Sequence, residues 1–195
     1  MPDFSGFVLA GGRSSRMGTD KAFLELDGRT LLARALDLLR CLTPEVRIVG
    51  PTAKFAAYGP VVEDIYAGRG PLAGIHAALS SSATELNLIL AVDLPFVTES
   101  LLRFLLERAR ATDAVVTVPR IAGGYQPLCA AYRRAFGSLA QAALESGRNK
   151  IDALFSVATT RVLEESELSR FAFDVRMFEN LNTPEDLRRA ATEKP

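Results

Sequence analysis

Histidine and cysteine, the usual ligands of structural zinc, are nearly missing from this chain. The 195 residues include one histidine, two cysteines and no tryptophan. A structural zinc site takes four such ligands, so the composition argues against one. Cys41 and Cys129 are far apart and lie among apolar residues. That setting is typical of buried, reduced thiols, and we expect both cysteines to be of this kind.

Excess charge of either sign is missing as well. Lysine and arginine total 23, aspartate and glutamate total 23, and the formal net charge is zero. Sequence-independent nucleic-acid binding depends on surplus lysine and arginine, so we expect no nucleic-acid partner. The first residues lack the basic and apolar segments of a signal peptide, and no apolar run approaches the length of a membrane span. We therefore expect a cytoplasmic protein with no membrane contact.

The chain does contain many apolar residues, 48% of the total, which is enough for a sizeable core. Strand-like apolar runs lie at 4–10, 46–49, 61–62, 86–92, 114–118 and 126–132. Helix-like stretches follow Thr30, run through 75–79, follow Thr98, cover 135–144 and begin at Thr183-Pro184. This alternation predicts an α/β fold, a three-layer, doubly wound and mostly parallel sheet, in a single domain over residues 1–195.

A loop rich in glycine and cations follows the first expected strand. It reads LAGGRSSRMGTDK from Leu9 to Lys21. Glycines let a ligand approach the backbone closely, and exposed N–H groups can cradle phosphate oxygens. The spacing fits neither a P-loop nor a dinucleotide-binding motif, and an ordinary surface loop is the alternative. Arg13, Arg16 and Lys21 in the same loop favour phosphate binding.

A carboxylate ends the most apolar of the expected strands. Asp93 follows the run 86–92 and precedes Leu94-Pro95. In an open α/β sheet, ligands bind beyond the carboxyl ends of the strands. A buried carboxylate is costly unless a cation meets it, and Mg²⁺ takes one or two carboxylates together with substrate phosphates. Asp93 is therefore either a magnesium ligand or, alternatively, a cap of the turn that follows it.

A third polar segment precedes the helix-like stretch at 75–79. Glu63-Asp64 is followed by a glycine-rich segment from Gly68 to Gly74. A glycine-rich helix start suits close approach of a ligand, and a plain loop with proline at the first helical position is the alternative. We expect His76 to be a partly buried structural residue and assign it no role.

Five motifs, in order, resemble one enzyme family. The run at 9–21 resembles the signature of nucleotidyltransferases that activate sugars, polyols or pterins. The motifs GPLAGI (70–75), AVDLPFV (91–97), QPLCAAY (126–132) and NLNTPEDL (180–187) narrow the resemblance to the molybdenum cofactor guanylyltransferases. This resemblance implies a Rossmann-like nucleotidyltransferase fold. It also implies a reaction in which a phosphate of molybdenum-bearing molybdopterin attacks the α-phosphorus of GTP, giving the guanine dinucleotide cofactor and pyrophosphate.

The same resemblance implies roles for individual residues. Lys21 and Arg16 would neutralise the phosphates and the leaving group, and Asp93 would hold Mg²⁺. Asp64 matches a family position near the nucleotide, and the two asparagines of the last motif match positions on the pterin side or near the metal. The residues expected to bind nucleotide or pterin are Leu9, Ala10, Gly11, Gly12, Lys21, Asp64, Gly70, Asn180 and Asn182.

The implied partners are GTP, molybdopterin, and the proteins that insert molybdenum or accept the finished cofactor. Family members often carry asparagines near the base after the second strand, whereas residues 48–54 contain none. The alternatives are therefore a cytidylyltransferase for the same pterin, a sugar-phosphate nucleotidyltransferase and a non-catalytic nucleotide-binding accessory protein. Ala10-Gly11-Gly12 and Asp20-Lys21 favour the guanylyltransferase over the cytidylyltransferase, and an intact Lys21 and Asp93 favour an enzyme over a pure binder.

Overall fold

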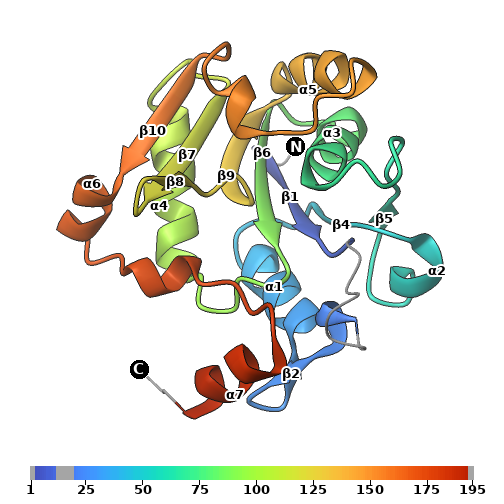
Figure 1. Cartoon of the computed structure of the whole chain (residues 1–195), viewed down its shortest axis with the longest axis vertical. Helices are drawn as coiled ribbons and strands as arrows, with labels where there is room; N and C mark the ends of the chain where they lie inside the picture. The colour runs from blue at the N-terminus through green and yellow to red at the C-terminus, as the bar shows by residue number, and fades with distance from the viewer. Residues whose placement is uncertain (1–2, 12–19, 193–195) are drawn as a thin grey trace.

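The computed structural model describes residues 3–11 and 20–192 and has one large sheet at its centre. The sheet has eight strands in the order β10-β7-β9-β6-β1-β4-β5, and β8 pairs with β7 (Figure 1). The strands are β1 Phe4–Leu9, β4 Val46–Val49, β5 Val61–Val62, β6 Leu86–Ala91, β7 Val116–Ile121, β8 Gly124–Tyr125, β9 Cys129–Arg133 and β10 Thr160–Glu164. A separate two-stranded hairpin consists of β2 Glu25–Leu26 and β3 Arg29–Thr30.

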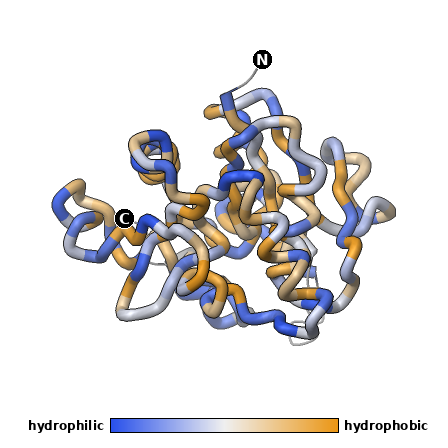
Figure 2. The backbone as a smooth tube through the Cα atoms, turned by 90° about the horizontal axis from the view of Figure 1, so that it is seen from above, coloured by the Kyte–Doolittle hydropathy of each residue, from blue (hydrophilic) through white to orange (hydrophobic). Residues whose placement is uncertain are grey.

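Helices cover both faces of this sheet, as expected for three layers. The helices are α1 Leu31–Arg40, α2 Thr52–Phe55, α3 Pro71–Ser81, α4 Glu99–Arg110, α5 Phe136–Glu145, α6 Glu165–Arg170 and α7 Pro184–Thr192. Side chains of β1 alternate between the two faces: Phe4 and Val8 pack with α1 and α4, whereas Phe7 and Leu9 pack with α3 and α5. Figure 2 shows how hydrophobic and hydrophilic segments alternate along the backbone.

The sheet is mostly parallel, as the sequence predicts. β1 is parallel to β4 and β6, β4 to β5, and β10 to β7. Two strands are exceptions: β9 runs antiparallel to both β6 and β7, and the short β8 runs antiparallel to β7. β9 is the longer of the two. It starts three residues later than the expected run at 126, since Gln126 closes a turn by accepting a hydrogen bond from Cys129 N at 3.1 Å.

Local signals placed the helix starts correctly. The Thr30 hydroxyl accepts from Ala33 N at 3.2 Å and caps α1, and the Thr98 hydroxyl accepts from Leu101 N at 3.3 Å and caps α4. The expectation for Cys41 is wrong: it is exposed, because it caps the C-terminal end of α1 at the surface. Cys129 is buried, as expected, and burial raises its pKa to about 12.

The register of the central strands determines where the site forms. Leu9 at the end of β1 pairs with Val49 at the end of β4 and with Ala91 at the end of β6. The hydrogen bond from Val92 N to Leu9 O, at 3.1 Å, continues this pairing beyond the sheet. The loops after β1 and β6 therefore leave the sheet side by side. Across the described ranges, no helix has both the length and the apolar character needed to cross a membrane.

Candidate active site

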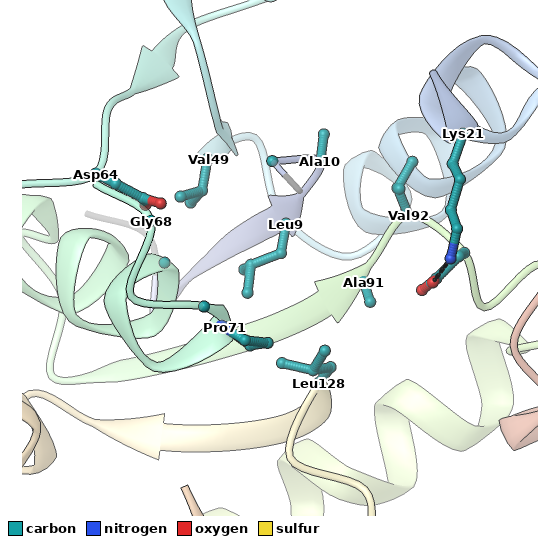
Figure 3. Close-up of a pocket in the computed structure, with 14 residues that line it drawn as sticks. Leu9, Ala10, Lys21, Val49, Asp64, Gly68, Pro71, Ala91, Val92 and Leu128 are labelled. Carbon is teal, nitrogen blue, oxygen red and sulfur yellow. Dashed lines mark hydrogen bonds and ion pairs between the residues drawn. The ribbon is translucent and has the colours of Figure 1, made fainter. Parts of the chain in front are cut away.

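A pocket of about 670 Å³ opens at the carboxyl ends of β1, β4 and β6. All three loops that the sequence analysis singled out contribute to it (Figure 3). Its lining residues are Leu9, Ala10, Gly11, Lys21, Val49, Asp64, Gly68, Gly70, Pro71, Gly74, Ala91, Val92, Asp93 and Leu128. This is the crevice at the strand ends in which open α/β sheets bind ligands.

A lysine and a carboxylate from two of these loops meet at one side of the pocket. Lys21 Nζ lies 3.0 Å from Asp93 Oδ2, and the two side chains are 22% and 19% exposed. Lys21 begins the short 3₁₀ helix η1, Lys21–Phe23, which Asp20 caps by accepting from Ala22 N at 3.1 Å. The turn after β6 is closed by the backbone, from Leu94 N to Ala91 O. The Asp93 carboxylate therefore contacts Lys21, a cation of the same pocket.

The C-terminal segment brings a third polar group to the same point. Asn182 Oδ1 accepts from Lys21 Nζ at 2.7 Å, although 161 positions separate the two residues. Leu181 N donates to the backbone oxygen of Asp93 at 3.0 Å, which ties this segment to the loop after β6. Asn180, next to Leu181, is exposed. The ammonium group of Lys21 thus contacts a carboxylate oxygen from the middle of the chain and an amide oxygen from its C-terminal segment.

Asp186, which the sequence analysis did not select, holds Asn182 in place. Its carboxylate accepts from Asn182 N at 3.0 Å and from Thr183 N at 2.9 Å. Thr183 reciprocates by accepting from Asp186 N at 3.1 Å, which caps α7. These hydrogen bonds to the charged carboxylate lower the pKa of Asp186. The only available sequence signal was an acidic residue in the first turn of a helix.

Asp64 faces Lys21 from the opposite side of the pocket (Figure 3). Its Oδ1 is buried and has no hydrogen-bond partner among the described residues. Burial raises the pKa of this carboxyl group above its ordinary value. A buried acceptor without a partner is costly in the free protein, and a ligand that donates a hydrogen bond there would remove that cost.

The N-terminal end of α3 supplies backbone groups to the pocket. Gly68 and Gly70 have φ of +75°, a conformation that side-chain-bearing residues rarely adopt. Gly70 is the N-cap of α3, and Pro71 occupies the first turn. Gly74 lets the helix approach β1, since an added Cβ would lie 3.3 Å from Leu9 Cδ2. The positive end of the helix dipole therefore lies at the pocket, which favours an anionic ligand.

Most of the expected site residues come together here. The structure brings Leu9, Ala10, Gly11, Lys21, Asp64, Gly70 and Asp93 to the pocket, and Asn182 next to it. Gly12 and Arg16 lie outside the described residues. Val49 and Leu128, which the sequence analysis did not select, add apolar wall. Apolar residues at strand ends carry no chemical signal of their own, so only their position in the fold reveals them.

His76 has the structural role expected of it. It is 4% exposed on α3, its Nε2 lies 3.2 Å from Ser80 Oγ, and its ring packs edge-on against Tyr66 at 5.2 Å. Burial lowers the pKa of His76, and the nearby Glu145 carboxylate opposes this. The histidine therefore helps to pack the segment before α3 against that helix.

Replacing Asp64 by asparagine should raise the melting temperature near neutral pH by roughly 1–3 °C. Burial favours protonated Asp64, so the free energy of unfolding falls as pH rises from the ordinary aspartate pKa to the raised one. An asparagine at this position does not titrate, so Asp64→Asn should show no such fall in the free energy of unfolding. Its gain in melting temperature over the native chain should therefore vanish as the pH falls to the ordinary aspartate pKa. Thermal unfolding across this pH range checks the expectation, with Asp113→Asn as an exposed control. An advantage that does not depend on pH would contradict it.

Comparison with known proteins yields consistent matches over most of the chain. Residues 6–162 match the model of the MobA-like NTP transferase domain. A probable molybdenum cofactor guanylyltransferase of Pelotomaculum thermopropionicum is 35% identical, covering 95% of this chain and 91% of the relative. A molybdenum cofactor guanylyltransferase of Desulfosudis oleivorans is 34% identical, covering 97% and 95%.

The fold also matches solved structures. The crystal structure of molybdopterin-guanine dinucleotide biosynthesis protein A from Archaeoglobus fulgidus superposes with a TM-score of 0.85 at 26% identity. The match covers 96% of this chain and 97% of that one. The mostly parallel sheet and its flanking helices are therefore shared over nearly the whole length of both chains.

Proposed function

The chain belongs to the MobA-like NTP transferase family, and from this premise we propose that it is a molybdenum cofactor guanylyltransferase. It transfers GMP from GTP to molybdenum-bearing molybdopterin in one nucleotidyltransferase domain over residues 1–195. The observation that carries the proposal is the meeting of Lys21, Asp93 and Asn182 beside the pocket at the strand ends. This arrangement supplies a cation and hard oxygen atoms where a triphosphate can lie.

The transfer needs no protein nucleophile. A phosphate oxygen of the pterin forms a bond to the α-phosphorus of GTP, the bond from that phosphorus to the bridging oxygen breaks, and pyrophosphate leaves. The attacking phosphate is already ionised, so catalysis rests on alignment and charge stabilisation. Lys21, which lines the pocket, would offset the negative charge, and the N-terminal end of α3 would add backbone dipoles. Cys129 is unsuited to attack, because its buried thiol has a pKa of about 12.

We propose Mg²⁺ as the divalent cation of this reaction. Among the described residues, no three histidine, cysteine, aspartate or glutamate side chains form a metal cage. Mg²⁺ binds through one or two carboxylates together with substrate phosphates, and the Asp93 carboxylate lines the pocket proposed for the triphosphate. Asp93 would hold Mg²⁺, and Asn182 Oδ1 contacts the same Lys21 Nζ as the Asp93 carboxylate. When bound, the metal would polarise the phosphoryl oxygens and neutralise part of their charge.

We propose a cytoplasmic location, and partner proteins that insert molybdenum or accept the finished cofactor. Asp64 would accept a hydrogen bond from the nucleotide through its partnerless oxygen. Leu9, Ala10, Gly11 and Gly12 would bind the nucleotide through their backbone, and Arg16 would join Lys21 at the phosphates.

The chain should use GTP in preference to CTP, ATP and UTP. A site built to hydrogen-bond one base rejects the others, because the wrong base leaves buried polar groups without partners. The ratio of kcat/KM values between the right and the wrong substrate then reaches roughly 10⁴. Each nucleotide is mixed with Mg²⁺ and molybdopterin, and the product is identified by mass while pyrophosphate is assayed. Preference for CTP would indicate the cytidylyltransferase. Nucleotide binding without pyrophosphate release would indicate the accessory protein.

The double change Asn180→Asp and Asn182→Asp should weaken pterin binding and turnover while GTP affinity changes little. Pterin binding should weaken because two new negative charges beside an incoming phosphate repel it. GTP affinity should change little because Asn182 contacts Lys21 but is not among the residues that line the pocket. Steady-state kinetics against each substrate and calorimetry with GTP alone separate the effects. The exposed Asn149, changed to aspartate, is the matched control. A loss confined to GTP binding, or to stability, would remove the pterin assignment.

A further inference from the structure

A second cavity, of about 230 Å³, lies behind the segment that carries Asp93. Val92 lines both cavities, but Asp93 lines the first, whereas Leu94, Pro95 and Val97 line the second. The second cavity is bounded by α1, on the opposite face of the sheet from α3. The proposed nucleotidyl transfer makes no use of this space.

Most residues that line the second cavity are apolar, and two arginines supply its polar surface. One face of α1 contributes Leu31, Ala35 and Leu38, which lie one and two turns apart. On the other side, the carboxyl end of β6 and the loop after it contribute Leu90, Val92, Leu94, Pro95 and Val97. A space of this size lies below the range of nucleotide and drug sites, so it suits a small molecule with an apolar body.

Two arginines give this cavity its polar side. Arg29 and Arg34 are among its lining residues, and none of the lining residues that the structure describes is acidic. Arg29 forms an ion pair with Asp37, and both side chains are about half exposed, so this pair neutralises Arg29 at the surface. Arg34 remains the cation that no carboxylate offsets among the lining residues.

The guanidinium of Arg34 is only partly satisfied. Its Nη1 donates to Leu26 O at 3.4 Å, close to the limit for a hydrogen bond. Its Nε is buried and has no hydrogen-bond partner among the described residues. A buried donor left without an acceptor is destabilising, and few internal hydrogen bonds hold this guanidinium. Arg34 also lines the cavity, so its guanidinium is the group on which an acceptor of a ligand would bind.

We propose that this cavity binds a small organic carboxylate, with its apolar body between α1 and the Leu94–Val97 segment and its carboxylate on Arg34. A carboxylate fits the fork of N–H groups on a guanidinium, and such charge-assisted bonds are among the strongest in proteins. Inorganic phosphate would satisfy Arg34 but leave the apolar walls without contacts. The site is separate from the nucleotide pocket and does not depend on the proposed transferase function.

Benzoate is the probe for this site, followed by methyl NMR of the intact chain. Saturable shifts at millimolar benzoate are expected in Leu31, Leu38 and Val97, and saturating GTP should leave them in place. Neutral benzamide, which has the same ring, and inorganic phosphate, which has only the charge, should each bind at least tenfold more weakly. Equal affinity for benzamide, shifts confined to Leu9, Val49 and Leu128 of the first pocket, or no saturable shifts would each overturn the proposal.

Two variants test which groups bind the probe. Arg34→Met keeps an unbranched stem but removes the guanidinium, and it should weaken benzoate at least tenfold. Arg103→Met, on an exposed arginine of α4 paired with Glu99, is the matched control and should leave the affinity unchanged. Because Arg34 also contacts Leu26, Ala35→Leu is a second variant that fills the cavity and keeps the charge. Benzoate binding that survives Ala35→Leu in a folded protein would place the probe elsewhere.

Discussion

Asp93→Asn should abolish cation-dependent transfer and leave the chain folded. The asparagine keeps the shape of the side chain but removes the charge that a hard cation requires. Loss of several kcal/mol of metal-assisted charge stabilisation corresponds to roughly a 10³-fold or greater fall in turnover. In the structure, the Asp93 carboxylate pairs with Lys21. The turn after β6 is closed by a backbone hydrogen bond from Leu94 N to Ala91 O, so the fold does not depend on this carboxylate as a cap.

The metal dependence of GTP binding gives the more specific readout for this variant. Calorimetry with and without Mg²⁺ should show that Mg²⁺ tightens GTP binding in the native chain and not in Asp93→Asn. The matched control is Asp174→Asn, because Asp174 caps the 3₁₀ helix η3, Val175–Phe178, by accepting from Arg176 N at 3.0 Å. Full activity of Asp93→Asn at ordinary Mg²⁺ concentrations would show that this carboxylate is not the metal ligand.

Lys21→Ala should lower turnover by ~10²–10³, the usual effect of removing one preorganised charge-stabilising donor. Lys21 Nζ is the group that the carboxylate of Asp93 and the amide oxygen of Asn182 both contact at the edge of the pocket. Its charge is needed most where negative charge develops on the leaving pyrophosphate. The stability change should be small, because ion pairs that are partly open to solvent contribute on the order of 1 kcal/mol or less.

Lys54→Ala is the matched control for Lys21→Ala. Lys54 also forms an ion pair with an aspartate, Asp20, and Asp20 is the immediate neighbour of Lys21. Lys54 does not, however, line the pocket. Turnover and thermal unfolding of both variants therefore separate loss of a catalytic charge from loss of a surface ion pair. Near-native turnover of a folded Lys21→Ala protein would remove this residue from the mechanism.

Much of the fold follows from local patterns that the sequence states directly. The strands β1 and β6 are mainly apolar and buried at every residue, and Thr30 and Thr98 stand where a helix cap is needed. Such features depend on hydrogen bonds and side-chain periodicity over a few residues, so they can be predicted without knowledge of distant contacts. Weaker elements escaped prediction: β10 is an edge strand with one buried residue, so it lacks the apolar run that marks a central strand.

By itself, the sequence determined which residues could carry the chemistry. A cation-rich glycine loop ending at Lys21, and a carboxylate at the end of the most apolar strand, already pointed to phosphate and metal. Tertiary structure alone decided which groups meet: Asn182 at Lys21, Asp186 holding Asn182, and Asp64 across the pocket. The second cavity is likewise formed by α1 and a loop far along the chain. Composition and residue spacing encode local preferences for helix, strand and turn. A contact between residues 161 positions apart depends instead on the order and register of the strands that bring them together.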